Sequence, residues 1–302
     1  MSRPQKGFSR RGWKALFTKR SVASKQKICY DGKNTRTGGG CGLNAERIRE
    51  LTENCPWSIE VFDEIDSTNS ELKRRTDVPH GTVLVTERQT GGRGRLGRRF
   101  VSPPGGVYLS VLLRPQARPD ELLHLTAMTA VAVRRAILAV SPLPVEIKWT
   151  NDLVCNGKKL CGILAELVGD AVVIGIGVNC NTPPEAFPPD VREIAGSLRS
   201  LGGKEIEPER LAAAMIRNLA EMDRVLLTRR REWLEEYARH CVTLGKTVRV
   251  MRGTEQRTAT ALHIDEYGAL VVRYENGETA AVSSGEVSVR GMYGYYEGGT
   301  QV

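Results

Sequence analysis

Three apolar, β-branched runs constrain the fold of this chain more than any other feature of its sequence. They are TVLVTE (82–87), VYLSVLL (107–113) and AVVIGIGVN (171–179). Runs of this length and composition are typical of strands that are buried on both faces. Such a sheet needs helices to cover it. The apolar period of residues 120–140, 207–227 and 230–240 predicts those helices, so we expect an α+β protein.

Further strands are expected over 59–65, 145–149 and 152–167, the last of these folded into a hairpin at Asn156-Gly157. A short helix is expected at 43–51, with Asn44 as its N-cap. After His240 the pattern changes to five short alternating strands separated by Gly and acidic turns. We therefore expect a mixed-sheet domain over 43–238 and a small SH3-like β-barrel over 241–291.

The positive charge of the chain is concentrated at its start. The formal net charge is +9, but residues 1–42 hold eleven of the 44 Lys and Arg residues and one of the 35 acids. This segment has no sustained apolar period, so we expect a disordered basic tail. Its composition also fits an organelle transit peptide or an upstream extension of the reading frame. The remaining chain is nearly neutral, so we expect no specific nucleic-acid partner.

Neither the cysteines nor the apolar runs indicate an extracellular or membrane protein. The seven cysteines include no C-x-x-C pair and no zinc-type spacing, which favours reduced thiols in the cytoplasm. No run approaches the roughly 18 apolar residues that a membrane-spanning helix needs. The sequence does not distinguish a monomer from a homodimer.

Residues 89–100, QTGGRGRLGRRF, form a long connection between two expected strands. Their glycines free the backbone to wrap a ligand, and their arginines offer planar cations suited to carboxylate or phosphate. An RNA-binding segment would need repeats and interleaved aromatic residues, which this single copy lacks. A solvated surface loop is the plainer alternative. We favour a loop that closes over an anionic small molecule.

Three other stretches carry groups that could serve such a ligand. KWTNDLVCNGKKLCG (148–162) places lysines near Asn151 and Asp152, and Asp152 can bind a hard cation such as Mg²⁺. GIGVN (175–179) alternates glycines in a strand, which marks a close approach of backbone or ligand. DSTN (66–69) offers hydroxyls and an amide. Each stretch alone has a purely structural explanation, as a turn, a hairpin or a helix cap.

The order of these motifs closely resembles that of the biotin protein ligases. They run D-S-T-N, E-x-Q-T-x-G-R-G-R-x-G-R, K-W-x-N-D-L, G-K-K-L-x-G-I-L-x-E and G-I-G-V-N, and the likeness spans residues 43–290. It implies an enzyme that joins biotin to the α-phosphate of ATP with Mg²⁺. The biotinyl group then passes to a lysine of a biotin carboxyl carrier domain. The DNA-binding domain of bifunctional members has no counterpart here, so we expect a monofunctional ligase.

The resemblance also implies the site residues by matching position. Catalytic roles fall on Lys159, Arg93 and Arg95, and we expect loss of Arg95 to release the adenylate. Biotin contacts fall on Ser67, Thr68, Asn69, Gln89, Arg93, Gly94, Arg95, Lys159, Gly162, Ile163, Gly175 and Gly177. ATP contacts fall on Arg98, Phe100, Lys148, Asn151, Asp152 and Asn179, with Asp152 also binding the metal.

Two positions depart from the pattern common in that family. Thr150 stands where Pro is common, and Phe100 stands where Trp is common. The first loosens the turn before Asn151, and the second offers adenine a smaller stacking face. A lipoate or octanoate ligase of related fold is the alternative function. The Arg-Gly loop and the C-terminal strands favour biotin.

Overall fold

The computed structural model describes residues 42–75, 77–252, 254–283 and 288–290, the last three by their backbone alone. The expected basic tail lies outside this part of the chain except for Gly42. A seven-stranded sheet has the order β1-β2-β3-β7-β6-β5-β4. The β1–β2 pair is parallel and the other pairs are antiparallel, so the mixed sheet expected from the sequence is confirmed. The strands are β1 (Ser58–Phe62), β2 (Thr82–Thr86), β3 (Val107–Leu113), β4 (Glu146–Lys148), β5 (Asp152–Cys155), β6 (Lys158–Val168) and β7 (Ala171–Val178).

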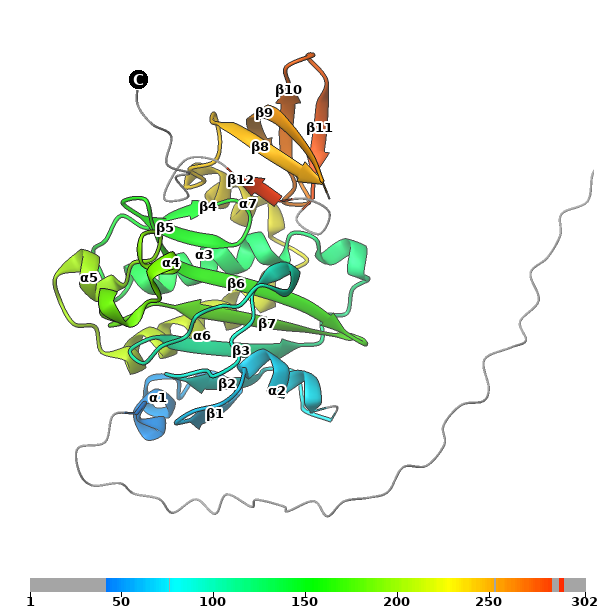
Figure 1. The fold of residues 1–302 in the computed structure, drawn as a ribbon. Coiled ribbons are helices and arrows are strands. Elements are labelled where there is room, and N and C mark those ends of the chain that lie inside the picture. The colour runs from blue at the N-terminus through cyan, green and yellow to red at the C-terminus, as the bar shows by residue number, and fades with distance from the viewer. Residues whose placement is uncertain (1–41, 76, 253, 284–287, 291–302) are drawn as a thin grey trace, which may run out of the picture. The chain divides into compact units, whose positions relative to one another are not determined.

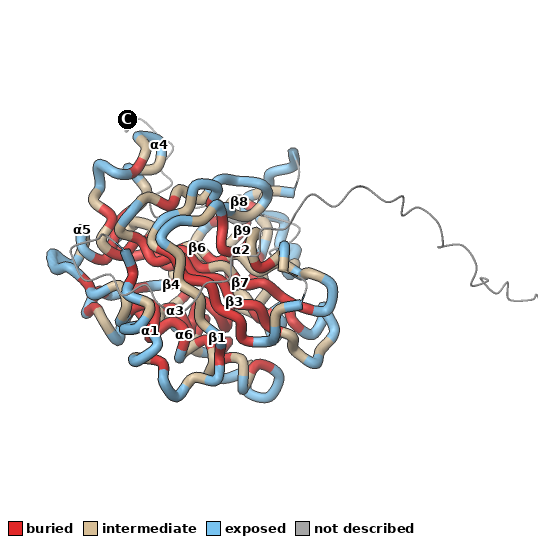
Figure 2. Tube along the Cα trace, turned by 90° about the horizontal axis from the view of Figure 1, so that it is seen from below, coloured by how far each residue is buried: buried red, intermediate tan, exposed pale blue. Residues whose placement is uncertain are grey.

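Helices cover one face of this sheet and leave much of the other face to loops (Figure 1). The covering helices are α3 (Leu125–Leu138) and α6 (Pro208–Val225), and α7 (Arg230–Arg239) packs against α3. Because side chains alternate along a strand, Ile174, Ile176 and Val178 of β7 join the core beneath these helices. The opposite face holds Val173 and a smaller core under α2 (Thr68–Arg74). In Figure 2 the buried residues follow the central strands β3, β6 and β7.

Several local predictions are confirmed. Helix α1 (Ala45–Leu51) begins where expected, and the Asn44 side chain accepts a hydrogen bond from the Arg47 amide at 3.0 Å. Asn156 and Gly157 form the β5–β6 turn with φ of 48° and 74°. Both values lie in the left-handed region that a two-residue hairpin requires, and Asn and Gly tolerate this region best.

The prediction of a continuous helix over 120–140 is wrong at the N-terminal end of that range. The structure has a 3₁₀ turn, η2 (Pro119–Leu122), and α3 begins only at Leu125. His124 lies between the two and is buried, and its Nε2 lies 3.0 Å from the Leu226 carbonyl oxygen. This tertiary contact accompanies the tightened first turn. Three short helices were not predicted from the sequence: η3 (Pro184–Ala186), α4 (Pro189–Arg192) and α5 (Leu198–Gly202).

The C-terminal strands form a separate antiparallel sheet with the order β11-β10-β9-β8-β12. They are β8 (Thr247–Arg252), β9 (Glu255–Ile264), β10 (Leu270–Tyr274), β11 (Thr279–Val282) and β12 (Ser288–Arg290). Five strands were expected, and five are present. Within the described residues the edge strands β11 and β12 do not pair, so the sheet is not a closed barrel. Across the described part of the chain, no helix is both long and apolar enough to cross a membrane.

Candidate functional site

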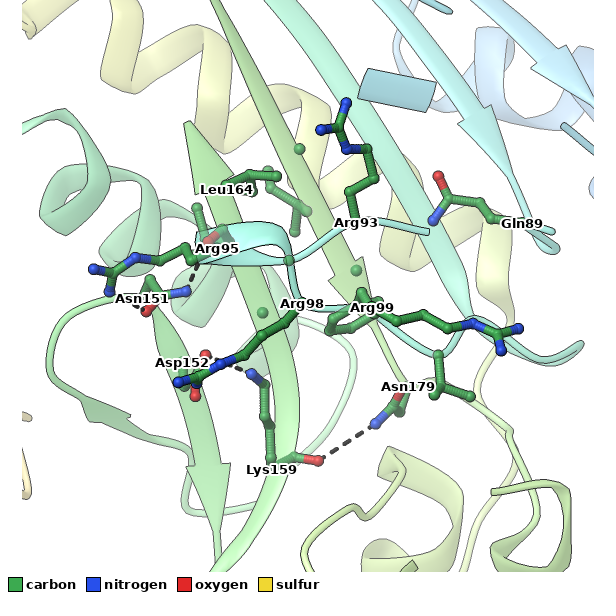
Figure 3. Close-up of a pocket in the computed structure, with 18 of the residues that line it drawn as sticks. Gln89, Arg93, Arg95, Arg98, Arg99, Asn151, Asp152, Lys159, Leu164 and Asn179 are labelled. Carbon is green, nitrogen blue, oxygen red and sulfur yellow. Dashed lines mark hydrogen bonds and ion pairs between the residues drawn. The ribbon is translucent and has the colours of Figure 1, made fainter. Parts of the chain in front are cut away.

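A cavity of about 320 Å³ lies on the face of the large sheet opposite α3 and α6. Figure 3 shows that its walls come from the Arg-Gly loop, from strands β5 to β7 and from the segment after β7. Every site residue predicted from the sequence lines this cavity except Lys148. These lining residues are Ser67, Thr68, Asn69, Gln89, Arg93, Gly94, Arg95, Arg98, Phe100, Asn151, Asp152, Lys159, Gly162, Ile163, Gly175, Gly177 and Asn179.

Three glycines form the floor of the cavity, and their lack of side chains has a direct structural reason. A Cβ on Gly162 or Gly177 would lie 2.7 or 2.4 Å from the Phe100 ring. A Cβ on Gly175 would lie 2.1 Å from Asn69 Oδ1. Side chains from other elements therefore rest directly on the sheet backbone. The alternating glycines of β7 are the sequence signature of this close approach.

The Arg-Gly loop lies across the cavity and is folded back on itself. The Gly94 amide donates to the Arg98 carbonyl at 2.8 Å, and the Phe100 amide donates to the Gly92 carbonyl at 3.0 Å. Leu96, at the tip, has a φ of 56° and is 69% exposed. The loop thus presents an apolar tip to solvent. Its arginine side chains spread in different directions over the cavity (Figure 3).

Arg95 joins this loop to the strands beneath it. Its Nη1 donates to Asn151 Oδ1 at 3.1 Å, and Asn151 Nδ2 donates to the Ile163 carbonyl at 2.8 Å. Burial lowers the pKa of the Arg95 guanidinium, and the neighbouring Asp152 carboxylate opposes that effect. A guanidinium stays charged under these conditions. Arg95 is therefore a half-buried cation that bridges the loop and the Asn151-Asp152 turn.

An ion pair lies at the centre of the site. Lys159 Nζ is 2.7 Å from Asp152 Oδ1, and it lies 5.8 Å from the centre of the Phe100 ring. Lys148 pairs in register with Asp152 across β4 and β5 and is only 8% exposed. Burial lowers the pKa of Lys148 to about 8. Lys148 thus adds positive charge beside Asp152, on the neighbouring strand, without lining the cavity.

A hydrogen-bonded network forms the opposite wall. Gln89 Oε1 accepts from the Thr68 amide at 2.9 Å and lies 3.2 Å from Thr68 Oγ1. Ser110 Oγ lies 2.6 Å from Thr68 Oγ1 and 2.5 Å from Asn69 Oδ1. Ser110, which is fully buried in β3, was not predicted from the sequence. Its alternation with Val111 in the VYLSVLL run could have revealed a polar side chain facing away from the helices.

Asn179 lies at the far end of the cavity from this network. Its Nδ2 donates to the Gly196 and Lys159 carbonyl oxygens at 2.9 and 3.3 Å. Its Oδ1 is buried and has no hydrogen-bond partner among the described residues. A buried acceptor without a partner costs free energy unless a ligand donor reaches it. The geometry therefore favours a ligand with an N–H group here.

An apolar wall was also missed. It consists of Leu164, Phe187, Val191, Ile194 and Ala195. Leu164 shares its sheet face with Gly162, so strand alternation could have indicated it. The other four belong to the segment between β7 and α5, where the sequence shows no clear period. Their position depends on tertiary contacts such as the hydrogen bond from the Lys159 amide to the Ile194 carbonyl at 2.7 Å.

Acidic residues around the cavity are few. Asp152 is the only carboxylate among the described lining residues, and the described part of the chain holds no cluster of three or more His, Cys, Asp or Glu side chains suited to a metal. Mg²⁺ is commonly held by one or two carboxylates together with substrate phosphates. Asp152 fits that mode of binding.

Comparison with known protein families identifies two matching regions. Residues 61–181 match the Biotin/lipoate A/B protein ligase family, and residues 243–290 match the Biotin protein ligase C terminal domain. The first region contains the Arg-Gly loop and the Lys159–Asp152 pair. The second covers the C-terminal sheet.

Individual relatives give the same result. The chain is 34% identical over 241 residues to the biotin--[acetyl-CoA-carboxylase] ligase of Mycobacterium tuberculosis, covering 76% of this chain and 88% of that protein. It is 33% identical over 236 residues to the bifunctional ligase/repressor BirA of Bacillus subtilis, covering 72% and 69%. A solved biotin protein ligase from Aquifex aeolicus in complex with biotin and ATP superposes with a TM-score of 0.71 at 31% identity, covering 77% and 98%.

Proposed function

Because this chain belongs to the biotin protein ligase family, we propose that it activates biotin with ATP as biotinyl-5'-adenylate and transfers the biotinyl group to a lysine of a biotin carboxyl carrier domain. In the first step the biotin carboxylate oxygen attacks the α-phosphorus of ATP, and pyrophosphate leaves. In the second step the carrier lysine amine attacks the acyl carbon, and AMP leaves. Both steps use the same cavity.

The charge distribution of the cavity supports the first step. A carboxylate and a triphosphate repel each other, so the site must supply cations that are already in place. Lys159 is fixed by its ion pair with Asp152, and Arg95 is fixed by Asn151. Lys148 adds buried charge beside Asp152. This grouping of cations over a backbone floor is the observation that carries the proposal.

We assign biotin to the end of the cavity formed by α2, the Gln89 region and the glycine floor. The residues proposed there are Ser67, Thr68, Asn69, Gln89, Gly162, Ile163, Gly175 and Gly177, with Arg93, Gly94, Arg95 and Lys159 toward its carboxylate. Thr68 and Gln89 offer polar atoms to the ureido ring. Lys159 and the loop arginines suit the carboxylate and the phosphate that joins it.

We assign ATP to the other end of the cavity. Asn179 Oδ1 is a buried acceptor that suits the exocyclic amino group of adenine. Phe100, on the glycine floor, offers an aromatic face. Arg98, Asn151 and Asp152 are proposed on the phosphate side, with Lys148 acting through its charge. Mg²⁺ would be held by Asp152 and by the phosphates, where it would neutralise charge on the leaving pyrophosphate.

The loop gives the second step its protection. An acyl-adenylate hydrolyses in water, so a site that makes one must cover it until the acceptor amine arrives. The Arg-Gly loop lies across the cavity through its contact with Asn151. We further propose a cytoplasmic setting, because the described cysteines are all free thiols, which fits a reducing compartment.

Pyrophosphate release tests this proposal directly. Purified protein with ATP and Mg²⁺ should release pyrophosphate when labelled biotin is added. When a biotin carboxyl carrier domain is then added, the labelled biotinyl group should appear on its lysine. Lipoate and octanoate serve as competing acids in parallel. Release with lipoate but not with biotin would replace the biotin proposal with a lipoate ligase, and release with none of the acids would refute acid activation.

A further inference from the structure

Glu166 lies on β6, on the same face as Gly162 and Leu164, and none of the roles above uses it. Its Oε1 is 2.7 Å from Lys73 Nζ, and its Oε2 accepts from Asn69 Nδ2 at 3.2 Å. Burial would raise the pKa of Glu166, but the hydrogen bonds from Lys73 and Asn69 outweigh it and lower the pKa. The group is therefore an ionised carboxylate, which can only accept hydrogen bonds.

This carboxylate fixes the orientation of the Asn69 amide. An amide can present either its NH₂ or its oxygen to a neighbour, but a carboxylate can accept a hydrogen bond only from the NH₂ group. The Leu164 carbonyl oxygen, 3.4 Å from Asn69 Nδ2, acts in the same sense. Asn69 Oδ1 must then face Ser110, whose Oγ lies at 2.5 Å. The Asn69 side chain is buried and rests on Gly175, so it has little freedom to rotate.

The orientation of Asn69 in turn determines which hydroxyl donates to which. Ser110 and Thr68 each have one hydroxyl proton, yet they take part in three close oxygen contacts, of 2.5, 2.6 and 3.2 Å. Ser110 Oγ donates to Asn69 Oδ1, the shortest of the three contacts, and also lies within donor distance of Thr68 Oγ1, while Thr68 Oγ1 donates to Gln89 Oε1. Both hydroxyl protons are therefore used within the network, and the Thr68 hydroxyl oxygen keeps a lone pair for a ligand.

We propose that Glu166, held in place by Lys73, is a positioning residue that sets the direction of these hydrogen bonds and so makes this wall of the cavity accept N–H donors. The inference rests on the proposed function, because the ureido ring of biotin carries two such N–H groups. The tails of lipoate and octanoate carry none. Glu166 would thus contribute to the choice of biotin without touching it.

The variant Glu166→Gln tests this chain of contacts while preserving the side-chain shape. Its amide has one oxygen, and the Lys73 ammonium competes for it. The new NH₂ group then faces the Asn69 NH₂, two donors in opposition, so Asn69 loses its orientation. We expect the biotin Kd to rise by about tenfold or more, as for a buried hydrogen bond that becomes unsatisfied. The KM for ATP and kcat at saturating biotin should change by less than about twofold.

The double variant Lys73→Met/Glu166→Gln separates orientation from general damage. Without Lys73 the oxygen of the introduced amide is free to turn to Asn69, so biotin binding should recover most of the loss. A merely structural role would make the double variant worse than the single one. Glu60→Gln is the matched control, because Glu60 pairs with Arg75 at 2.8 Å on β1. It should leave the biotin Kd unchanged.

Isothermal titration with biotin, together with thermal unfolding of each variant, gives the decisive numbers. Tight binding by the wild type, weak binding by Glu166→Gln and recovery in the double variant would support the inference. If the wild type binds biotin and Glu166→Gln has the same biotin Kd, the inference is overturned but the proposed function stands. The same holds if the double variant does not recover biotin binding. A wild-type chain that neither binds biotin nor releases pyrophosphate would overturn the proposed function and the inference with it.

Discussion

Removing the Arg95 cation should make the enzyme lose its adenylate. Arg95→Met keeps most of the length of the side chain but removes its charge and the hydrogen bond to Asn151 Oδ1 at 3.1 Å. That bond connects the Arg-Gly loop to the turn that carries Asp152. Arg95→Met therefore removes this hydrogen bond between the closed loop and the turn.

The size of the effect follows from the type of contact. A hydrogen bond from a charged group contributes about 1.5–3 kcal/mol to a closed state. Arg95 is half-buried, so solvent screening reduces this value only in part. If the whole amount goes into holding the loop closed, adenylate should dissociate roughly 10 to 150 times faster. Arg95→Gly should be at least as fast, because glycine also frees the backbone.

The assay forms labelled adenylate on the enzyme, removes pyrophosphate with pyrophosphatase and follows loss of label after excess unlabelled biotin is added. Serum albumin in a parallel reaction reports biotinylation by released adenylate. Arg88→Met is the control, because Arg88 directly precedes the loop, pairs with Glu64 at 2.9 Å and does not line the cavity. An Arg95→Met variant that retains adenylate as long as the wild type, or an Arg88→Met variant that leaks equally, would refute the role of Arg95 in holding the loop closed.

Three further predictions follow from packing and charge. Gly177→Ala brings a methyl group within 2.4 Å of the Phe100 ring, so it should destabilise the fold by about 1–3 kcal/mol in urea unfolding, and adding Phe100→Leu should recover part of the loss. Folding lowers the pKa of Lys148 from 10.5 to about 8. Between these two pH values the Lys148 amine therefore binds a proton in the unfolded chain but not in the folded chain. The stability of the wild type relative to Lys148→Met should therefore rise from pH 8 to pH 10.5, and a flat difference would contradict the buried charge. Trp149→Phe removes the hydrogen bond from Nε1 to the Gly268 carbonyl at 3.2 Å and should lower the free energy of unfolding by about 1–3 kcal/mol, again measured in urea.

The features that sequence patterning predicted well are those encoded locally. The buried strands, the Asn156-Gly157 turn and the Asn44 cap depend on a few adjacent residues, and the structure confirms them. The glycine alternation of β7 predicted a close approach of backbone or ligand, and the groups that approach these glycines in the structure are the Phe100 and Asn69 side chains. The pattern did not identify them, because they come from distant parts of the chain.

The features that patterning missed depend on contacts between distant segments. The break before α3 coincides with the contact between His124 and the Leu226 carbonyl, about a hundred residues along the chain. The apolar wall from Phe187 to Ala195 has no period of its own. The family resemblance gave Lys148 as an ATP contact, but Lys148 does not line the cavity, and the strand register pairs it with Asp152. No single-sequence pattern contains the register of a three-residue strand.

The turn before Asn151 has a consequence for how such proteins can be recombined. The Trp149 amide donates to Thr243 Oγ1 at 3.0 Å, its indole donates to Gly268 in the β9–β10 turn, and the Tyr237 hydroxyl donates to the Thr150 carbonyl at 3.1 Å. The loop that presents Asp152 to the cavity is thus supported by residues late in the chain. A chimaera that exchanged the C-terminal sheet between relatives would inherit a working site only if these supporting contacts were exchanged as a unit with the turn they hold.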